Sequence, residues 1–367
     1  MTDEPPPPGA SAAAPARPSW LRRHKVLSAF LAMVLLLGVG VGSWLVYLQN
    51  LTGDIKRVDI GLDDAERPPT GAGSTDSTGA LNILVAGADN GASGGSIADD
   101  VGSGTWEPYS HRSDTIMIMH VSADRDSVAL VSIPRDSYVQ IYDESGDPAG
   151  RSKINDAFGR YGPSGYISTI EHLTDLRMDH LAILEWEAFS DLTTALGGVQ
   201  VYIPETFRDT SQNITWEKGT QLLEGEKALA YVRTRYGLDD GDFGRIERQQ
   251  NFMRALLDKL VDNGTMSNPV RITKVLQVVS RNLIVDEGWE SDEIQDLVFS
   301  LRGVRADDVT FVTAPLGKYD TTAGGASIVR LAQPDTGELW DSIRTDDVQR
   351  WAAAHTEDRL GQPDDVS

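Results

Sequence analysis

The chain has 367 residues, with 33 Lys and Arg, 55 Asp and Glu, and no cysteine. The lack of cysteine excludes a disulfide scaffold, a Cys-ligated zinc or iron–sulfur site and a cysteine nucleophile. The formal net charge of −22 argues against nucleic-acid binding, because a polyanion repels an acidic protein. With 40% hydrophobic residues, the chain has enough apolar material for a packed core.

Three segments are predicted to precede the folded domain. Residues 1–25 are rich in Pro and Ala and end in a basic cluster, which indicates a disordered cytoplasmic tail. Val26–Leu48 carries no charge and is long enough to cross a bilayer core of ~30 Å as a helix. The alternatives are a buried core helix and the apolar region of a cleaved signal peptide, which is usually shorter. Basic residues before the span predict a single-pass cell-membrane protein whose remainder is extracytoplasmic, and the polar residues 49–78 indicate a linker.

Apolar periodicity then predicts one α/β domain over residues 79–351. The expected strands are Leu81–Ala86, Thr115–Val121, Ser127–Ile133, Tyr138–Tyr142, His180–Trp186, Val199–Ile203, Val309–Thr313 and Ser327–Leu331. The expected helices are Ser164–Leu173, Glu187–Leu196, Glu224–Tyr231, Phe243–Val261, Pro269–Val279 and Ser291–Leu301. Because strands and helices are interleaved, we expect a mixed central β-sheet flanked by helices. Asn90–Ser110 is expected to be a surface loop, and residues 352–367 a polar C-terminal tail.

A local basic cluster stands out between residues 231 and 250 of this acidic chain. If residues 233–235 are extended, Arg233 and Arg235 point to the same side. Asp242 is placed to cap the next helix, and Arg245 falls in its first turn, where backbone N–H groups favour an anion. One face of that helix carries Arg245, Arg248 and Gln249. Guanidinium groups suit phosphate oxygens, so the cluster indicates a phosphate or pyrophosphate site; the alternative is ordinary surface salt bridges.

A second group of charged residues flanks the first strands. Asp89 and Asp114 lie at strand ends, where two carboxylates can hold Mg²⁺ together with water and a substrate phosphate. The alternative is that both are turn residues. Pro134 ends a strand, so Arg135 is expected to project into a loop, where active-site residues often lie. No P-loop, kinase signature or HExxH motif is present in the sequence.

Several motifs in one order resemble the LytR–CpsA–Psr family of bacterial cell-envelope proteins. They are LNILVAGAD (Leu81–Asp89), RSDTIMIMHV (Arg112–Val121), VALVSIPRDSYVQI (Val128–Ile141), KINDAF (Lys153–Phe158), ALGGVQVYIPE (Ala195–Glu205), GEKALAYVRTR (Gly225–Arg235) and DFGRIERQQ (Asp242–Gln250). The resemblance runs from about Leu81 to at least Ala255, and more weakly to about Ile343. The strand end departs from the family, because it reads Ala-Gly-Ala-Asp where Gly-Ser-Asp is commoner. The loop over residues 90–111 is also long.

The resemblance implies a transferase that moves a glycopolymer, with its phosphate, from a polyprenyl-pyrophosphate carrier to a peptidoglycan hydroxyl. It implies Mg²⁺ held by Asp89 and Asp114, and an apolar tunnel for the polyprenyl chain between sheet and helices. The arginines implied to hold the pyrophosphate are Arg112, Arg135, Arg233, Arg235 and Arg245. Further substrate-binding residues implied by the resemblance are Lys153, Asp242 and Gln249, and the catalytic residues are Asp114, Arg135 and Arg245. The alternatives are a polyprenyl-pyrophosphate-binding protein or pyrophosphatase, and a membrane-bound regulator of envelope synthesis.

Overall fold

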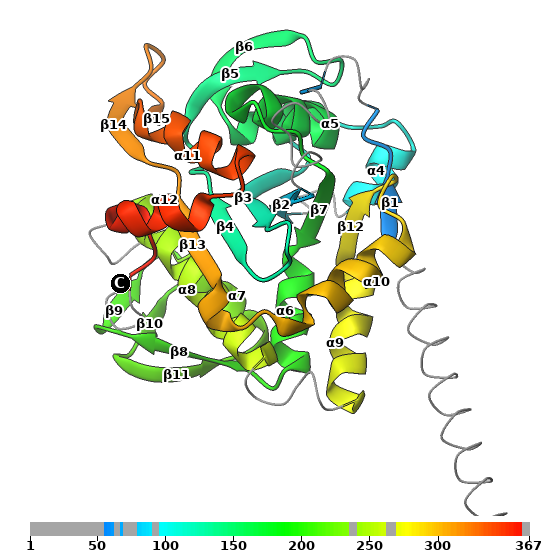
Figure 1. Ribbon diagram of the computed structural model, residues 1–367. Helices are drawn as coiled ribbons and strands as arrows, with labels where there is room; N and C mark the ends of the chain where they lie inside the picture. Colours follow the sequence, from blue (N-terminus) through cyan, green and yellow to red (C-terminus); the bar gives the residue numbers. More distant parts are fainter. Residues whose placement is uncertain are drawn as a thin grey trace, which may run out of the picture. The chain divides into compact units, whose positions relative to one another are not determined.

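The computed structural model of the protein describes residues 55–61, 67–68, 79–89, 95–234, 241–261 and 269–361. The centre of this part of the chain is a seven-stranded sheet (Figure 1). Its strands lie in the order β1 (Lys56–Val58), β12 (Leu283–Asp286), β7 (His180–Glu185), β2 (Leu81–Asp89), β3 (Arg112–Val121), β4 (Val128–Ser132) and β13 (Val309–Thr313). Parallel and antiparallel pairs both occur, so the predicted mixed sheet is confirmed.

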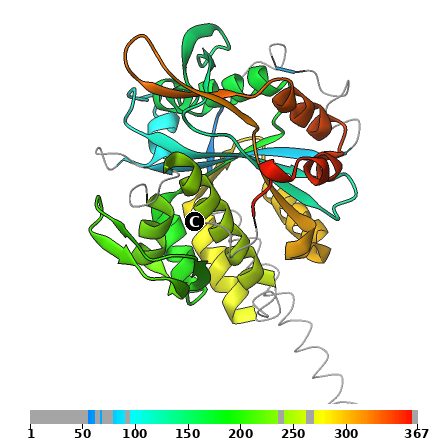
Figure 2. The ribbon, with the colours of Figure 1, turned by 90° about the vertical axis from the view of Figure 1, so that its left-hand side faces the viewer.

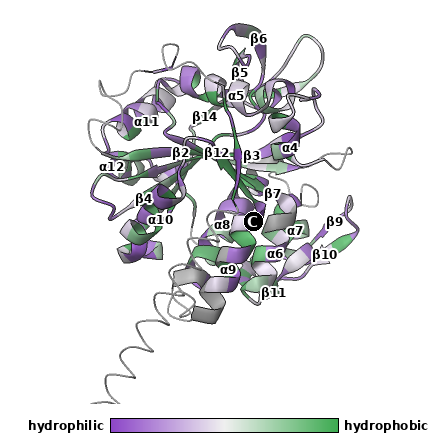
Figure 3. Ribbon diagram, turned by 90° about the vertical axis from the view of Figure 1, so that its right-hand side faces the viewer, coloured by the Kyte–Doolittle hydropathy of each residue, from purple (hydrophilic) through white to green (hydrophobic). Residues whose placement is uncertain are grey.

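The strand β2 is buried on both faces, which explains its nearly continuous apolar sequence. Leu84 and Ala86 pack into one hydrophobic core, together with Phe158 and Ile167. Ile83 faces the opposite side and packs into a separate cluster. The central strands therefore carry the hydrophobic colour in Figure 3. The one buried polar side chain inside β2, Asn82, is hydrogen-bonded to the Arg177 carbonyl and to His120, and the strand's one carboxylate, Asp89, lies at its last residue.

Helices cover both faces of the sheet (Figure 2). On one side lies α5 (Asn155–Thr174), beside α11 (Asp335–Arg344) and α12 (Val348–Ala354). The other side carries α6 (Trp186–Ala195), α7 (Gly225–Arg233), α8 (Gly241–Val261) and α9 (Pro269–Asn282), whose own core includes Phe189, Val232 and Phe252. The helix α10 (Ser291–Ser300) follows β12 along the chain. The predicted α/β architecture is thus confirmed.

Four two-stranded antiparallel sheets extend this framework. They are β5 (Tyr138–Tyr142) with β6 (Pro148–Lys153), β8 (Val199–Ile203) with β11 (Gly219–Leu223), β9 (Phe207–Asp209) with β10 (Ile214–Trp216), and β14 (Leu316–Thr321) with β15 (Ser327–Leu331). A bridge between Ser137 and Val329 seats the last hairpin beside the first, as Figure 1 shows. The sequence predicted β5, β8 and β15 but not their partners, because the partner strands are short or largely exposed.

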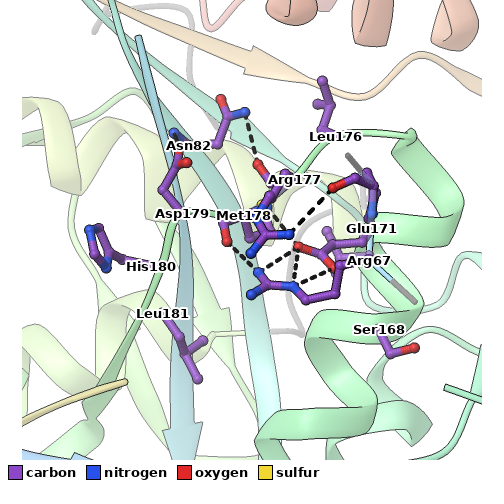
Figure 4. Close-up of polar contacts among 12 residues, drawn as sticks. Arg67, Asn82, Ser168, Glu171, Leu176, Arg177, Met178, Asp179, His180 and Leu181 are labelled. Atoms are coloured by element: carbon purple, nitrogen blue, oxygen red, sulfur yellow. Dashed lines mark hydrogen bonds and ion pairs between the residues drawn. The ribbon is translucent and has the colours of Figure 1, made fainter. Parts of the chain in front are cut away.

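The predicted linker, residues 49–78, contains parts that belong to the domain. The strand β1 pairs in parallel with β12, and Val58 is buried in the core. Further on, Arg67 forms an ion pair with Glu171 of α5, at 2.8 Å between Arg67 Nη2 and Glu171 Oε1, and also donates 2.6 Å to the carbonyl of Met178 (Figure 4). The Glu171 side chain is 1% exposed. The buried Glu171 carboxylate requires a charged partner, and Arg67 of the predicted linker is that partner. The linker prediction is therefore corrected for these residues.

Two other segments also differ from their predictions. Residues 97–102 of the expected loop form α4 (Ile97–Gly102), and Trp106 packs edge-on against Phe158 of α5 at 5.5 Å between ring centroids. At the C-terminus, Arg359 bridges to Val312, and the Leu360 N–H donates 3.2 Å to the carbonyl of Phe311. Residues 356–361 are therefore part of the domain rather than a free tail, because they add backbone hydrogen bonds to β13.

Among the described residues, no helix is long and apolar enough to cross a membrane. The predicted span Val26–Leu48 and the predicted cytoplasmic tail lie outside the described residues, and both stay predictions.

Candidate functional site

The candidate site begins at one end of the sheet, where β2 ends and β3 starts. Asp89, the last residue of β2, lies opposite Arg112, the first residue of β3. The register shifts between the pairs Ala88–Ser113 and Gly87–Thr115, which leaves Asp114 as the extra residue of a bulge. A bulge bends its strand and redirects a side chain. The two predicted metal-binding carboxylates and Arg112 are therefore brought to the same sheet end.

Asp114 belongs to a row of alternating charges that we call the charged network: Asp114, Arg135, Asp136 and Lys153. Arg135 Nη1 lies 2.5 Å from Asp114 Oδ1, and Arg135 Nε lies 3.9 Å from Asp136 Oδ2. Lys153 Nζ lies 2.7 Å from the other oxygen of Asp136. Their side chains are 18–29% exposed, so water and a ligand can reach them. Arg135 does lie in the turn after β4, as predicted.

Arg245 approaches the charged network from the opposite layer. It lies in α8, is 2% exposed, and lines a small pocket together with Arg135, Pro134 and Tyr319. The helix begins at Gly241, so Asp242 lies inside the helix rather than before it, and Arg245 falls in the second turn rather than the first. Asp242 is therefore not the residue directly before the helix, as the sequence analysis expected, and its side chain lies outside the described part of the chain.

Arg248 and Gln249 lie on the same buried face of α8 but serve different purposes. Arg248 Nη2 donates 3.0 Å to the carbonyl of Thr234, which fixes the chain directly after α7. Gln249 accepts 3.3 Å from the Thr115 hydroxyl and donates 3.3 Å to the carbonyl of Val232. Burial raises the pKa of Tyr231 to about 12, although the nearby Arg248 cation lowers it, so this phenol stays protonated. Gln249 thus ties β3 to the helices immediately beside Asp114.

Arg233 is not arranged as the sequence suggested. Arg233 is the last residue of that helix, not part of an extended segment, and its guanidinium lies 4.9 Å above the ring of Trp186. The apolar residues of Ala228–Val232 extend the helix further than predicted, because they pack against α6 and α8. Arg235 lies outside the described residues, so its predicted pairing with Arg233 is a prediction still.

An apolar cavity separates the sheet from the helices next to these residues. Gly87 of β2 forms part of its wall, and a Cβ there would meet the Thr115 Cβ at 2.9 Å. Trp186, whose ring contacts the Arg233 guanidinium, also lines this cavity. The full lining is Val85, Gly87, Thr115, Met117, Leu184, Glu185, Trp186, Phe189, Val232, Gln249 and Met253. A hydrocarbon chain is the chemistry that such a lining accepts.

The donor set can be tested for Mg²⁺. Within the described ranges, no group of three or more His, Asp or Glu residues is placed to hold a metal. Asp89 and Asp114 nevertheless supply two carboxylates at adjacent strand ends. Mg²⁺ is commonly held by one or two carboxylates, with water and substrate phosphate completing its octahedron. The residues therefore fit a magnesium ion that arrives with a phosphate-bearing substrate.

Three residues of the site were missed by the sequence analysis. Asp136 forms ion pairs with both Arg135 and Lys153. The Thr115 hydroxyl donates a hydrogen bond to Gln249, and Trp186 forms a cation–π contact with Arg233. Asp136 directly follows Arg135 and Thr115 directly follows Asp114, so their positions in the sequence could have indicated that they belong to the site. Trp186 offered no such indication, because its contact joins residues 47 positions apart.

Comparison with known proteins finds relatives over most of the chain. The LytR_cpsA_psr family model matches residues 48–345. The cell wall biosynthesis protein LcpA of Corynebacterium glutamicum is 32% identical over 69% of this chain and 53% of its own length. The transferase TagV of Bacillus subtilis, named as a polyisoprenyl-teichoic acid–peptidoglycan teichoic acid transferase, is 33% identical over 47% of this chain and 44% of its own. The chain thus spans about half the length of these relatives.

Solved structures share the fold. The crystal structure of B. subtilis TagV aligns with a TM-score of 0.59 and 23% identity, covering 74% of this chain and 98% of the other. A LytR-Csp2A-Psr enzyme from Actinomyces oris aligns with a TM-score of 0.60 and 22% identity, covering 79% and 95%.

Proposed function

The chain belongs to the LytR–CpsA–Psr family, and from that membership we propose that it transfers a glycopolymer from a polyprenyl-pyrophosphate carrier to a peptidoglycan hydroxyl. One observation carries the proposal: a charged network lies beside an apolar cavity, and Gln249 and Thr115 connect the two. A lipid pyrophosphate has the same two halves, a polyanion and a hydrocarbon chain. Relatives named as teichoic acid transferases support this reading.

The proposed reaction is a displacement at the phosphorus that carries the glycan. The acceptor hydroxyl oxygen forms a new bond to this phosphorus, and the bond to the bridging oxygen breaks. The products are a glycan–phosphate–peptidoglycan diester and a polyprenyl phosphate, and the hydroxyl proton passes to a nearby base. Phosphoryl transfer depends on positioning and charge neutralisation more than on a covalent nucleophile. Arg135, Arg245 and Lys153 supply the positive charge here.

The carboxylates take two further parts in this proposal. Asp89 and Asp114 would hold Mg²⁺, which supplies additional charge neutralisation when it is bound. A carboxylate at this sheet end can also accept the proton of the acceptor hydroxyl. Asp136 keeps the Arg135 and Lys153 side chains in place, because it contacts both. Arg112, at the exposed start of β3, is placed to meet the substrate from the solvent side.

The apolar cavity is proposed to hold the first isoprene units. Each buried methylene contributes roughly 0.8 kcal/mol, so even a short stretch of chain adds substantial affinity. Arg233 stands over Trp186 at this cavity and would face the lipid phosphate. The membrane span proposed for Val26–Leu48 would keep the domain on the extracytoplasmic side, where the carrier and peptidoglycan meet. Alkaline phosphatase fused after Asn50 tests this topology, because it is active only when exported.

Reconstitution tests the transferase directly. The full chain is incubated with Mg²⁺, a polyprenyl-pyrophosphate glycan labelled in its sugar, and peptidoglycan, and the label bound to peptidoglycan is counted. We expect attachment that stops when a chelator is added. Label released as soluble glycan phosphate, without attachment, would instead identify a pyrophosphatase. Intact donor in the presence of folded protein would refute the proposed function.

A further inference from the structure

A second groove lies on the α5 side of the sheet and is separate from the apolar cavity. It encloses about 390 Å³, which is within the usual range for small-ligand sites. Its walls come from the β5–β6 hairpin, the C-terminal half of α5 and the strand β15. The residues that matter for its chemistry are Tyr138, Gln140, Tyr142, Arg151, His172 and Arg330. The segments come together beside α5 in Figure 1.

Two arginines of this groove share one aromatic ring. The guanidinium carbon of Arg151 lies 5.3 Å from the ring centroid of Tyr138, and that of Arg330 lies 5.6 Å from it. Arg330 is paired with Asp320, at 2.9 Å between Nε and Oδ2. Arg151 forms no ion pair with any carboxylate of the described residues, and its hydrogen bond goes to the Tyr138 carbonyl. The groove thus holds more positive than negative charge, in a protein whose formal net charge is −22.

The rest of the wall adds aromatic and hydrogen-bonding surface. His172 stacks on Tyr142, with 3.8 Å between ring centroids and 14° between planes. His172 Nδ1 lies 2.8 Å from the Ser168 carbonyl, which holds the imidazole in this stacked position. Both His172 and Arg151 are exposed. A ligand that fits such a wall carries anionic oxygens for the arginines and a partly apolar ring for the aromatic side chains.

The groove is connected to the charged network through one short segment. Arg135 and Asp136 belong to the network. Tyr138 and Gln140, which follow Asp136 by two and four positions, line the groove. Across the Ser137–Val329 bridge, Val329 lines the Arg245 pocket while the adjacent Arg330 lines the groove. Three residues of extended chain span only ~10 Å, so one oligosaccharide can reach from the groove to the network.

We propose that this groove, built on Tyr138, Tyr142, Arg151, His172 and Arg330, is a subsite for an anionic saccharide. The proposal rests on the proposed function, because that function brings two anionic saccharides to the site: the glycan strand of peptidoglycan, with its carboxylates, and a phosphate-bearing glycopolymer. The groove lies on the opposite side of the sheet from the apolar cavity. Lipid and saccharide are thereby directed to different layers, with the charged network between them.

Binding measurements on the full chain in detergent test this subsite without any reaction. The probes are a peptidoglycan disaccharide tetrapeptide, a glycerol-phosphate oligomer, and neutral chitotetraose, each titrated by calorimetry. We expect at least one anionic probe to bind about tenfold more tightly than chitotetraose. Arg151→Gln should weaken that binding roughly tenfold, because a charge-assisted contact is lost. The control substitution Arg350→Gln changes a side chain that is 86% exposed and lies outside the groove. This variant should bind the anionic probe as tightly as the wild type does.

The outcomes separate this inference from the proposed function. Selective muropeptide binding assigns the groove to the acceptor, and selective glycerol-phosphate binding assigns it to the donor glycan. The subsite is refuted if neither anionic probe binds, if chitotetraose binds equally well, or if folded Arg151→Gln binds like the wild type. A glycan-free polyprenyl pyrophosphate should bind wild type and Arg151→Gln alike. If the wild type does not bind this lipid, the proposed function is contradicted, independently of the results with the saccharide probes.

Discussion

The charged network and the apolar cavity adjoin each other, but they are built by opposite means. In the network, Asp114, Arg135, Asp136 and Lys153 are partly exposed and paired with one another. In the cavity, Gly87 leaves space because it has no side chain, and Trp186 and Phe189 pack around that space. A polyanion can be bound only if the paired charges rearrange, whereas a hydrocarbon needs only the space. Charge changes in the network should therefore affect turnover, and shape changes in the cavity should affect lipid affinity.

The largest effect is expected from Asp114→Ala. This change removes the acceptor 2.5 Å from Arg135 and one of the two proposed magnesium-binding carboxylates. We expect transfer to fall about a hundredfold or more, with a weaker dependence on Mg²⁺. The rate of glycan attachment at several Mg²⁺ concentrations measures this. Asp296→Ala removes an exposed carboxylate on α10 and serves as the control. Turnover like that of the wild type in excess chelator would contradict the metal assignment.

Arg135→Lys should come next. Arginine reaches Asp114 through Nη1 and approaches Asp136 through Nε, and a single ammonium cannot take both positions. Losing one charge-assisted hydrogen bond costs about 1.5–3 kcal/mol, so we expect a tenfold to hundredfold lower rate. Steady-state kinetics against donor concentration, with a thermal melt to confirm folding, measure it. If lysine substitutes freely, Arg135 is only an exposed ion-pair residue.

Gly87→Ala tests the cavity rather than the network. The new Cβ would lie 2.9 Å from the Thr115 Cβ, so β2 and β3 must shift, at a cost of about 1–3 kcal/mol in stability. The shift also strains the bond from Thr115 to Gln249. We expect a melting temperature lower by a few degrees and roughly tenfold weaker binding of a polyprenyl pyrophosphate. Gly303→Ala places a Cβ in open space and should change neither quantity.

The smallest effect is expected from Arg233→Gln. The side chain is exposed and stacked 4.9 Å above Trp186, and an exposed cation–π contact contributes about 0.5–1 kcal/mol. We expect twofold to fivefold weaker lipid binding and an unchanged rate at saturating donor. Calorimetry with a glycan-free lipid pyrophosphate separates the two quantities. A large fall in the saturated rate would instead place Arg233 in the charged network.

The sequence predicted much of the network and less of the cavity. Asp114 and Arg135 could be placed together because each lies at the end of a strand in a readable hairpin. The strands β1 and β12 were missed because three or four residues carry too little pattern, and their pairing joins residues far apart in the chain. Arg233 was misjudged because the packing of α7 against its neighbours, rather than local propensity, decides where that helix ends.

The roles within α8 show the same limit. The spacing of Arg245, Arg248 and Gln249 correctly predicted one shared face. It could not show that Arg248 holds the Thr234 carbonyl while Gln249 bonds Thr115, because both partners come from other elements. Periodicity identifies the face of a helix, and tertiary packing decides which residue on that face supports the fold and which one meets a ligand.

The attachment of β1 and Arg67 has a mechanical consequence. A pull on the chain from its N-terminal side enters the domain along β1, whose parallel pairing with β12 places the ladder hydrogen bonds across the direction of force. Bonds loaded in this way share the tension and break together rather than one at a time. If β1 is released, the tension passes along the chain to Arg67, which is held to Glu171 and Met178. The domain thus meets tension with two successive attachments, and the second is a buried ion pair at α5.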